Sequence, residues 1–418
     1  MQKFYKFLLV YCSSFTGLTK SIWCDLFVNF LATFFSSFFY YLSYYFVHEL
    51  NFSVKSASFF ISFYGLGSML GGLFGGKLSD KYSPASIAAI SLFFQGLFFL
   101  IFSEIRQTTY IVISIFIFGV FTYTFLTSNY ISILKKCNNG NASKLKAISL
   151  LAVISNAGLG ASALAISSFK AINFNIIFAV SGLVLTIMSL ILIKSNISID
   201  SNNKLSTNKQ PSITKNNISN QLKSSHTKVI NYMVLISVLF IGIIISQMST
   251  TYSLYIKSNF PEYGLGGFGI IFLINTLLIV TTQAQITSYL SDKNKFLYTG
   301  MGAFFIALGM FVLAYANNFY SIILACIFYT LGEIAFFSLS QLLCYENAPV
   351  DQKGTWTGYY RMMLGASRVI GPALGGAIYQ HISGAGLWLF CFGIGAICFF
   401  MYFTYSILGS SEIISFHN

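Results

Sequence analysis

Charged residues are scarce in this chain of 418 residues, where Asp, Glu, Lys and Arg together make up only 8%. Soluble domains carry about 25% charged residues, which cover the surface that faces water. Hydrophobic residues make up 56% of the chain, and the mean hydropathy is +0.72. The composition therefore excludes an ordinary water-soluble protein and predicts that most of the surface faces lipid.

Other absences narrow the class of protein further. Five prolines are too few for a proline-rich linker, and seven cysteines without CxxC spacing argue against a disulfide framework. The chain has no HExxH or GxSxG motif and no soluble sensor domain, so an enzyme or a receptor is disfavoured. No metal and no cofactor is expected. The net charge of +13 does not predict nucleic-acid binding, because the lysines lie between apolar segments.

Long apolar segments account for most of the chain. A spanning helix needs about 20 apolar residues. The sequence predicts twelve such helices, near residues 22–47, 53–78, 85–103, 109–134, 146–168, 172–193, 229–256, 264–290, 297–316, 319–345, 354–381 and 385–408. A shorter apolar run at residues 4–18 predicts an interfacial helix, with a signal peptide as the alternative. The predicted fold class is an all-α integral membrane protein.

The chain divides into two similar halves. The tetrapeptide LSDK at residues 78–81 returns 212 residues later at 290–293, each time between two apolar segments. Internal repetition of this kind is typical of transporters. We predict a six-helix half at residues 1–193, a flexible linker rich in Asn, Ser and Lys at 194–228, and a second six-helix half at 229–418.

Lys and Arg are unevenly divided between the two ends of the predicted helices. If both chain termini lie in the cytoplasm, eighteen of them lie on the inner side and four on the outer side. The outer four are Lys55, Arg106, Lys170 and Lys257. Because basic residues concentrate in cytoplasmic loops, we predict that both termini and the linker are cytoplasmic.

Glycines recur at helical spacing in two of the predicted helices. Gly67, Gly71 and Gly75 lie four residues apart in the second helix, and Gly371 and Gly375 do so in the eleventh. Small residues at this spacing let two helix backbones approach closely in lipid. We expect close helix contacts here, with simple bend points or a smooth lipid-facing surface as the alternative.

Four ionisable side chains fall within predicted spanning helices, where a charge costs about 2.5–3.5 kcal/mol at the helix centre. They are Asp25, Glu333, Arg361 and Arg368. Glu333 and Arg368 both lie roughly 18–21 Å from the inner ends of their helices, at 1.5 Å per residue. This equal depth allows an ion pair between them. Arg361 and Arg368 are seven residues apart and share a helix face.

Each of these residues has a structural and a functional interpretation. Glu333 either locks two helices together or takes up and releases protons, and we favour proton coupling. Arg368 is either its structural partner or a ligand for an anionic substrate, whereas Arg361, nearer the cytoplasm, is interpreted as structural. Asp25 is either a second proton-coupling residue or an interfacial residue near a helix N-terminus, where negative charge is stabilised.

Uncharged polar side chains, mixed with Phe and Tyr, form stripes on several predicted helices. Taken singly, an amide in lipid usually bonds to a neighbouring helix. Taken together, they predict a cavity for an amphiphilic ligand. The predicted cavity residues are Arg368, Gln341, Phe337, Gln247, Thr251, Tyr255, Asn29, Asn156 and Asn275.

The chain resembles the major facilitator superfamily over nearly its whole length. Two six-helix halves, a polar central linker and an LSDK turn after helices two and eight carry the resemblance. It is tightest at TLGE 330–333, AP 348–349, Gly354 and GPALGG 371–376, and NAG 156–158 fits as well. Together these segments look like the drug–proton antiporter branch of bacterial exporters.

The resemblance implies a secondary transporter of the bacterial inner membrane that moves a small amphiphilic molecule by alternating access. Asp80 and Lys81, with Asp292 and Arg361, would form the cytoplasmic gate, and Asp80 would cap or pair near the start of helix eleven. The expected partners are the substrate, protons and lipid, without nucleic acid, and the expected oligomeric state is a monomer.

Three departures from the family pattern leave direction and coupling open. The basic residues that usually follow the first LSDK-type turn are missing, the fourth helix lacks an arginine, and the fifth helix has Ser162-Ala163 where Gly-Pro is usual. Proton-coupled efflux is the favoured interpretation. An importer of a small anionic metabolite, with Arg368 binding a carboxylate, is the alternative.

Overall fold

The computed structural model describes residues 17–415, apart from 43–44, 47–48, 53, 103, 138–140, 169–173, 204–218 and 250. All regular secondary structure in this part of the chain is helical, which confirms the predicted fold class. The interfacial helix predicted at residues 4–18 lies almost wholly outside the described residues.

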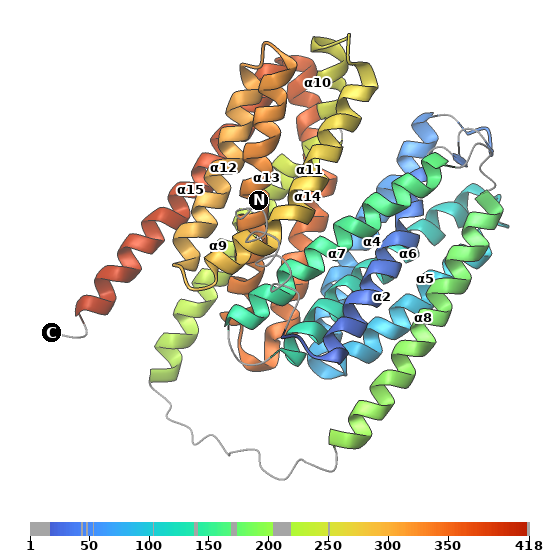
Figure 1. Ribbon diagram of the computed structural model, residues 1–418, viewed down its shortest axis with the longest axis horizontal. Coiled ribbons are helices and arrows are strands. Elements are labelled where there is room, and N and C mark those ends of the chain that lie inside the picture. Colours follow the sequence, from blue (N-terminus) through green and yellow to red (C-terminus); the bar gives the residue numbers. More distant parts are fainter. Residues whose placement is uncertain are drawn as a thin grey trace, which may run out of the picture.

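The helices form two bundles that stand side by side (Figure 1). The N-terminal bundle consists of α2 (Lys20–Ser36), η1 (Ser37–Tyr41), α4 (Val54–Lys81), α5 (Pro84–Phe102), α6 (Thr108–Lys136), α7 (Asn141–Ser168) and α8 (Phe174–Asn203). The C-terminal bundle consists of α9 (Ser219–Ser246), η2 (Gln247–Ser249), α10 (Thr251–Asn259), α11 (Gly264–Leu290), α12 (Lys295–Ala314), α13 (Phe319–Glu346), η3 (Val350–Gln352), α14 (Lys353–His381) and α15 (Gly384–Ser415).

The predicted spanning segments correspond to these helices, with η2 and α10 continuing the seventh. Among the described residues, ten helices are long and apolar enough to cross a membrane. The two long helices outside this set are α4 and α14, which are rich in glycine and contact each other between the bundles. The predicted linker is helical at both ends, because α8 runs to Asn203 and α9 begins at Ser219, and residues 204–218 are not described.

Side-chain caps define two of the helix starts. Asn294 and Asn318 precede α12 and α13, and their side-chain oxygens accept hydrogen bonds from the backbone N–H of Leu297 and Ser321 at 3.1 and 2.9 Å. These bonds satisfy donors that have no partner within the first turn of a helix. The short polar turns between spanning helices therefore also set where each helix begins.

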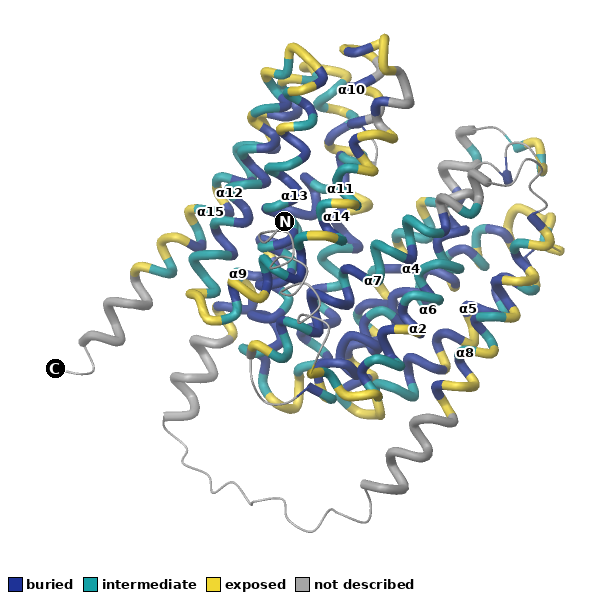
Figure 2. Tube along the Cα trace, in the orientation of Figure 1, coloured by how far each residue is buried: buried dark blue, intermediate teal, exposed yellow. Residues whose placement is uncertain are grey.

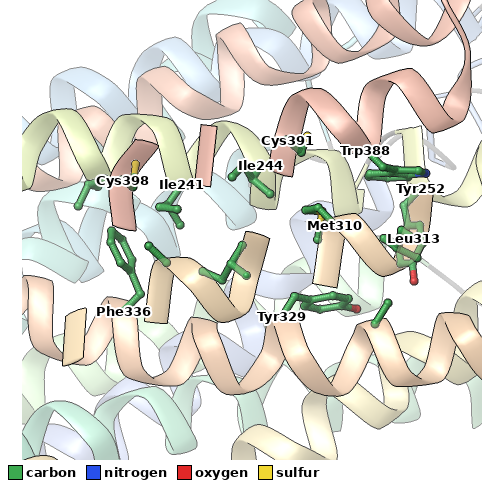
Figure 3. Packing of buried hydrophobic residues seen from close by; sticks show 14 of the residues in the cluster. Ile241, Ile244, Tyr252, Met310, Leu313, Tyr329, Phe336, Trp388, Cys391 and Cys398 are labelled. Carbon is green, nitrogen blue, oxygen red and sulfur yellow. The ribbon is translucent and has the colours of Figure 1, made fainter. Parts of the chain in front are cut away.

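Each bundle has its own apolar core. The core of the C-terminal bundle joins α9, α10, α12, α13 and α15, with large rings such as Trp388, Tyr252 and Phe336 packed between the helices (Figure 3). In the N-terminal bundle, rings such as Phe118 and Phe178 contact Phe99. Buried residues follow the inner sides of the helices in both bundles (Figure 2). Large apolar side chains on the outer sides stay exposed, as expected where lipid replaces water.

Glycines let α4 lie close to two other helices at once. Gly67, Gly71 and Gly75 face α6, and a Cβ on Gly71 would lie 2.9 Å from the Cα of Val120. The neighbouring Gly76 faces α14, where a Cβ would lie 2.6 Å from the Cα of Gly358. The close helix contact predicted from the glycine spacing is therefore present. The row of Gly67, Gly71 and Gly75 faces a helix of its own bundle, and the adjacent row that includes Gly76 faces the other bundle.

Candidate functional site

The contact between the bundles, here called the seam, joins α4 to α14, α7 to α11, and α6 to α14. A third apolar cluster bridges it, with Tyr130 and Leu134 of α6 and Ile148 of α7 on one side and Leu339 and Tyr345 of α13 on the other. These residues lie toward the end of the bundles that carries Asp80, called the Asp80 end. The bundles are therefore packed together at the Asp80 end.

Asp80, at the end of α4, binds the first turn of α14. Its carboxylate accepts hydrogen bonds from the backbone N–H groups of Gly354 and Thr355 and from the hydroxyl of Thr355, each at 2.6 Å. The N-terminus of a helix presents unpaired N–H groups and a partial positive charge, both of which favour a carboxylate. The predicted capping by Asp80 near the start of helix eleven is therefore observed, and it crosses the seam.

A second polar contact crosses the seam at the same end. Glu346, at the end of α13, forms an ion pair of 2.6 Å with Lys295 of its own bundle and one of 3.9 Å with Lys144 of α7. Lys353 lies nearby, and its pKa is lowered, first by burial and then by the positive charge of Lys144. The negative charge of Glu346 partly offsets this by raising the pKa of Lys353. The Asp80 end is thus held by charged contacts as well as by apolar packing.

Two arginines of α14 rest on tyrosines of α6. The guanidinium carbon of Arg361 lies 5.5 Å from the ring centre of Tyr130, and that of Arg368 lies 5.4 Å from the ring centre of Tyr123. Both arginines therefore point across the seam, as their shared helix face predicts. Arg361, Tyr130 and the predicted cavity residue Gln341 also border a small gap at the seam, which has no room for a water molecule.

The predicted ion pair between Glu333 and Arg368 is not formed. Among the described residues, no ion pair within 4.0 Å includes either side chain. Instead, the side-chain N–H of Asn275 donates to Glu333 at 3.4 Å and to Thr330 at 2.9 Å. The side chains point to different neighbours: Glu333 toward α11 and Arg368 toward α6.

Asp25 forms an ion pair inside the N-terminal bundle. Its carboxylate lies 2.6 Å from Lys136 of α6 and accepts a hydrogen bond of 3.3 Å from Ser132. Its side chain is 5% exposed, so the pair holds α2 and α6 together in a largely buried setting. This geometry favours the structural interpretation of Asp25 over proton coupling.

Two predicted cavity amides of the N-terminal bundle bond to helices of that same bundle. Asn29 donates to Ser155 of α7 at 2.8 Å and accepts from Asn129 of α6 at 3.4 Å. Asn156 donates to the backbone carbonyl of Ala152 at 3.0 Å, within its own helix. Asn29 therefore ties three helices together, and Asn156 has only a local bond in the described structure.

The polar stripe predicted on the seventh helix lies inside the C-terminal bundle rather than along the seam. Gln247 donates to the carbonyl of Gly371 at 2.8 Å, Thr251 donates to Gln247 at 3.0 Å, and Tyr255 donates to the carbonyl of Leu313 at 2.8 Å. All three are buried. The helix changes into the 3₁₀ segment η2 at Gln247.

The remaining predicted residues have fewer contacts. Phe337 packs against the core of the C-terminal bundle. Asp292, in the second LSDK copy, is exposed, and no bond to its carboxylate is described, whereas the adjacent Lys293 lies 5.1 Å from the ring centre of Tyr289. Lys81 is exposed as well. The two LSDK copies are therefore equal in sequence but not in contacts.

Sequence reasoning missed the partners of several charges. Tyr123 and Tyr130 have the same spacing of seven as Arg361 and Arg368, and this match was the available signal. No comparable sequence pattern indicated the ion pairs of Lys136 with Asp25 and of Lys144 with Glu346.

Within the described residues, no three His, Cys, Asp or Glu side chains gather as a metal site would require.

The fold and the seam define a multi-pass membrane protein built from two six-helix bundles. The family model of the Major Facilitator Superfamily matches residues 26–372. The chain therefore belongs to the major facilitator superfamily of transporters. Its membership of the drug–proton antiporter branch stays a prediction.

Known sequences resemble parts of the chain. It is 28% identical over 154 residues to the uncharacterized MFS-type transporter YqjV of Bacillus subtilis. This matched segment covers 36% of each protein. It is 27% identical over 127 residues to the riboflavin transporter RibZ of Clostridioides difficile, which covers 30% of this chain and 28% of that one. The matched segments thus span about a third of these relatives.

Solved structures resemble nearly the whole chain in fold. The human organic anion transporter MFSD10 (TETRAN) matches with a TM-score of 0.68 and 11% identity, covering 91% of this chain and 97% of that one. A bacterial homologue of the iron transporter ferroportin, solved in an outward-facing state, matches with a TM-score of 0.70 and 11% identity, covering 94% and 100%. At such low identity, these matches describe the fold alone.

Proposed function

We propose that the protein is a secondary transporter that moves a small organic molecule by rocking its two bundles about a central site. The observation that carries this proposal is the bond from Asp80 to the first turn of α14. It joins the two bundles through a few polar atoms at one end, so it can break and re-form without unfolding either core. With the predicted topology, the state described here is closed toward the cytoplasm.

Glu333 is the proposed proton-coupling residue. It is half-buried on α13, and its described partner is the neutral amide of Asn275. A carboxylate in a membrane interior without a cation is costly, and a bound proton removes that cost. A change in water access between the two states would then let Glu333 bind a proton on one side and release it on the other.

The test of this coupling is the change Glu333→Gln, which keeps size and hydrogen bonding but cannot titrate. In proteoliposomes we expect uptake driven by a pH gradient to be abolished, while exchange of substrate at equal pH on both sides continues. Glu262→Gln, an exposed acid in the turn before α11, is the matched control and should keep both activities. Gradient-driven uptake that persists in Glu333→Gln would show that coupling lies elsewhere.

Efflux of an amphiphile is the favoured direction, since the sequence resembles bacterial exporters in TLGE 330–333 and GPALGG 371–376. One sequence relative is named as a transporter of riboflavin, an organic molecule, and this supports an organic substrate. Import of an anionic metabolite is the second candidate. The observation that favours it is that Arg368 is exposed on α14 and points across the seam.

A further inference from the structure

The arginines of this chain are concentrated on one helix. The sequence contains three, and two of them, Arg361 and Arg368, lie on α14. They are seven residues apart, or about 10.5 Å along a helix. Under them, on α6 of the other bundle, lie Tyr130 and Tyr123, which are also seven residues apart. The result is two parallel arginine–tyrosine pairs that cross the seam at successive depths.

Neither arginine has an anionic partner in the described part of the chain. The nearby acids are used elsewhere: Asp80 by the backbone of α14, Glu346 by two lysines and Glu333 by an amide. A tyrosine ring attracts the cation but accepts few of the five N–H groups of a guanidinium. The Nε of Arg361 is buried without a hydrogen-bond partner in the described structure. Both guanidinium groups therefore lack an anionic acceptor from the described part of the chain.

The two pairs differ in access. Arg368 is exposed, and its guanidinium lies over a ring of α6, so the exposed side chain lies at the seam. Arg361 borders the small gap at the seam, which has no room for a water molecule, and a Cβ on Gly72 of α4 would lie 2.8 Å from the Cβ of Arg361. The contact of α4 with α14 that closes the Asp80 end therefore also encloses Arg361.

We propose that the substrate of this transporter carries an anionic group, such as a carboxylate or a sulfonate, on an organic body. Arg368 binds this group while the Asp80 end is closed, and Arg361 binds it after that end opens. The tyrosines hold each guanidinium in place while it carries no ligand. The planar fork of a guanidinium fits two oxygens of such a group. This inference rests on the proposed transport function and specifies its substrate class.

The test compares probes that differ only in charge. Binding of 2-naphthalenesulfonate, 2-naphthoate and the neutral 2-naphthamide is measured by calorimetry on the purified full chain in detergent. We expect the two anions to bind to the wild type and the amide to bind at least about tenfold more weakly, since a hydrogen bond to a charged group is lost. Uptake of the same probes into proteoliposomes should follow the same order.

The variants test the assigned residue. Arg368→Gln should weaken binding of both anions about tenfold or more. The affinity of Arg368→Lys should lie between those of the wild type and Arg368→Gln, because an ammonium keeps the charge but not the planar fork of donors. Arg106→Gln, in the exposed turn before α6, is the control and should bind as the wild type does. Arg361→Lys and Arg361→Gln should slow uptake of the anions, and thermal unfolding checks that both variants are folded.

Three results would overturn the inference: equal binding of the amide and the anions, no binding of either anion to the wild type, or unchanged anion binding by Arg368→Gln. None of these results affects the proposed transport mechanism. That mechanism is tested separately, by thiol labelling at the seam and by Glu333→Gln, and neither measurement depends on the charge of the substrate.

Discussion

Loss of the Asp80 charge should open the seam at the Asp80 end. Asp80→Asn keeps one acceptor oxygen but removes the carboxylate that accepts three hydrogen bonds at the start of α14. Charge-assisted hydrogen bonds contribute about 1.5–3 kcal/mol each, and Asp80 is half-buried, so we expect a net loss of about 2 kcal/mol. This corresponds to a shift of ~30-fold toward the state open at the Asp80 end.

The native thiol of Cys344 can report this shift. Cys344 is 1% exposed, and its thiol donates to the carbonyl of Trp356 in its own bundle at 3.5 Å. It also borders the small gap at the seam together with Tyr130. In a background where Cys344 is the only cysteine, its labelling by N-ethylmaleimide follows the population of the open state. We expect Asp80→Asn to raise the labelling rate by up to ~30-fold in inverted vesicles.

The second LSDK copy provides the control for this experiment. Asp292→Asn makes the same chemical change in the same tetrapeptide, but Asp292 is exposed and lacks a described bond to the other bundle. Its labelling rate should equal that of the parent. Equal rates for all three proteins, at normal expression, would show that the Asp80 contact does not hold the bundles together and would refute the proposed gate.

Three further predictions follow from the same contacts. Gly76→Ala should also raise labelling of Cys344, because its Cβ would lie 2.6 Å from the Cα of Gly358 across the seam, whereas Gly269→Ala, with no heavy atom within 4 Å of its Cβ, should not. Lys136→Met should lower the free energy of unfolding by roughly 2 kcal/mol, a loss between those measured for exposed and for buried ion pairs. Thermal unfolding measures this loss, and the double change with Asp25→Asn should recover part of the lost stability. A cysteine at Ser206 should resist an impermeant thiol reagent added outside intact cells, and ready labelling would reverse the predicted topology.

The architecture was accessible from sequence because apolar length and internal repetition are properties of the chain itself. Twelve apolar segments and a repeated LSDK turn predict two six-helix halves without any knowledge of packing. The contact partner of Asp80 could be predicted in part, because the N-terminus of a helix attracts a carboxylate. The sequence could not predict that Asp292 lacks such a contact, because the two tetrapeptides are identical and differ only in which helix start lies opposite them.

The site residues show where sequence reasoning stops. Depth along a helix is set by residue number, so Glu333 and Arg368 were placed at similar depth, but the direction of each side chain depends on helix rotation. That rotation turns Glu333 toward α11 and Arg368 toward α6. Likewise, the polar stripe of the seventh predicted helix bonds within its own bundle, and no signal in the sequence predicted the 3₁₀ segment at Gln247.

The two glycine rows of α4 have different consequences for substitutions. A larger residue at Gly71 would press on α6 within the same bundle, in every state of the protein. A larger residue at Gly76 would press on α14 only while the Asp80 end is closed. Variants of the first row should therefore lower the amount of protein that reaches the membrane, whereas variants of the second row should leave that amount unchanged and alter its turnover. One helix thus offers a way to separate defects of assembly from defects of motion.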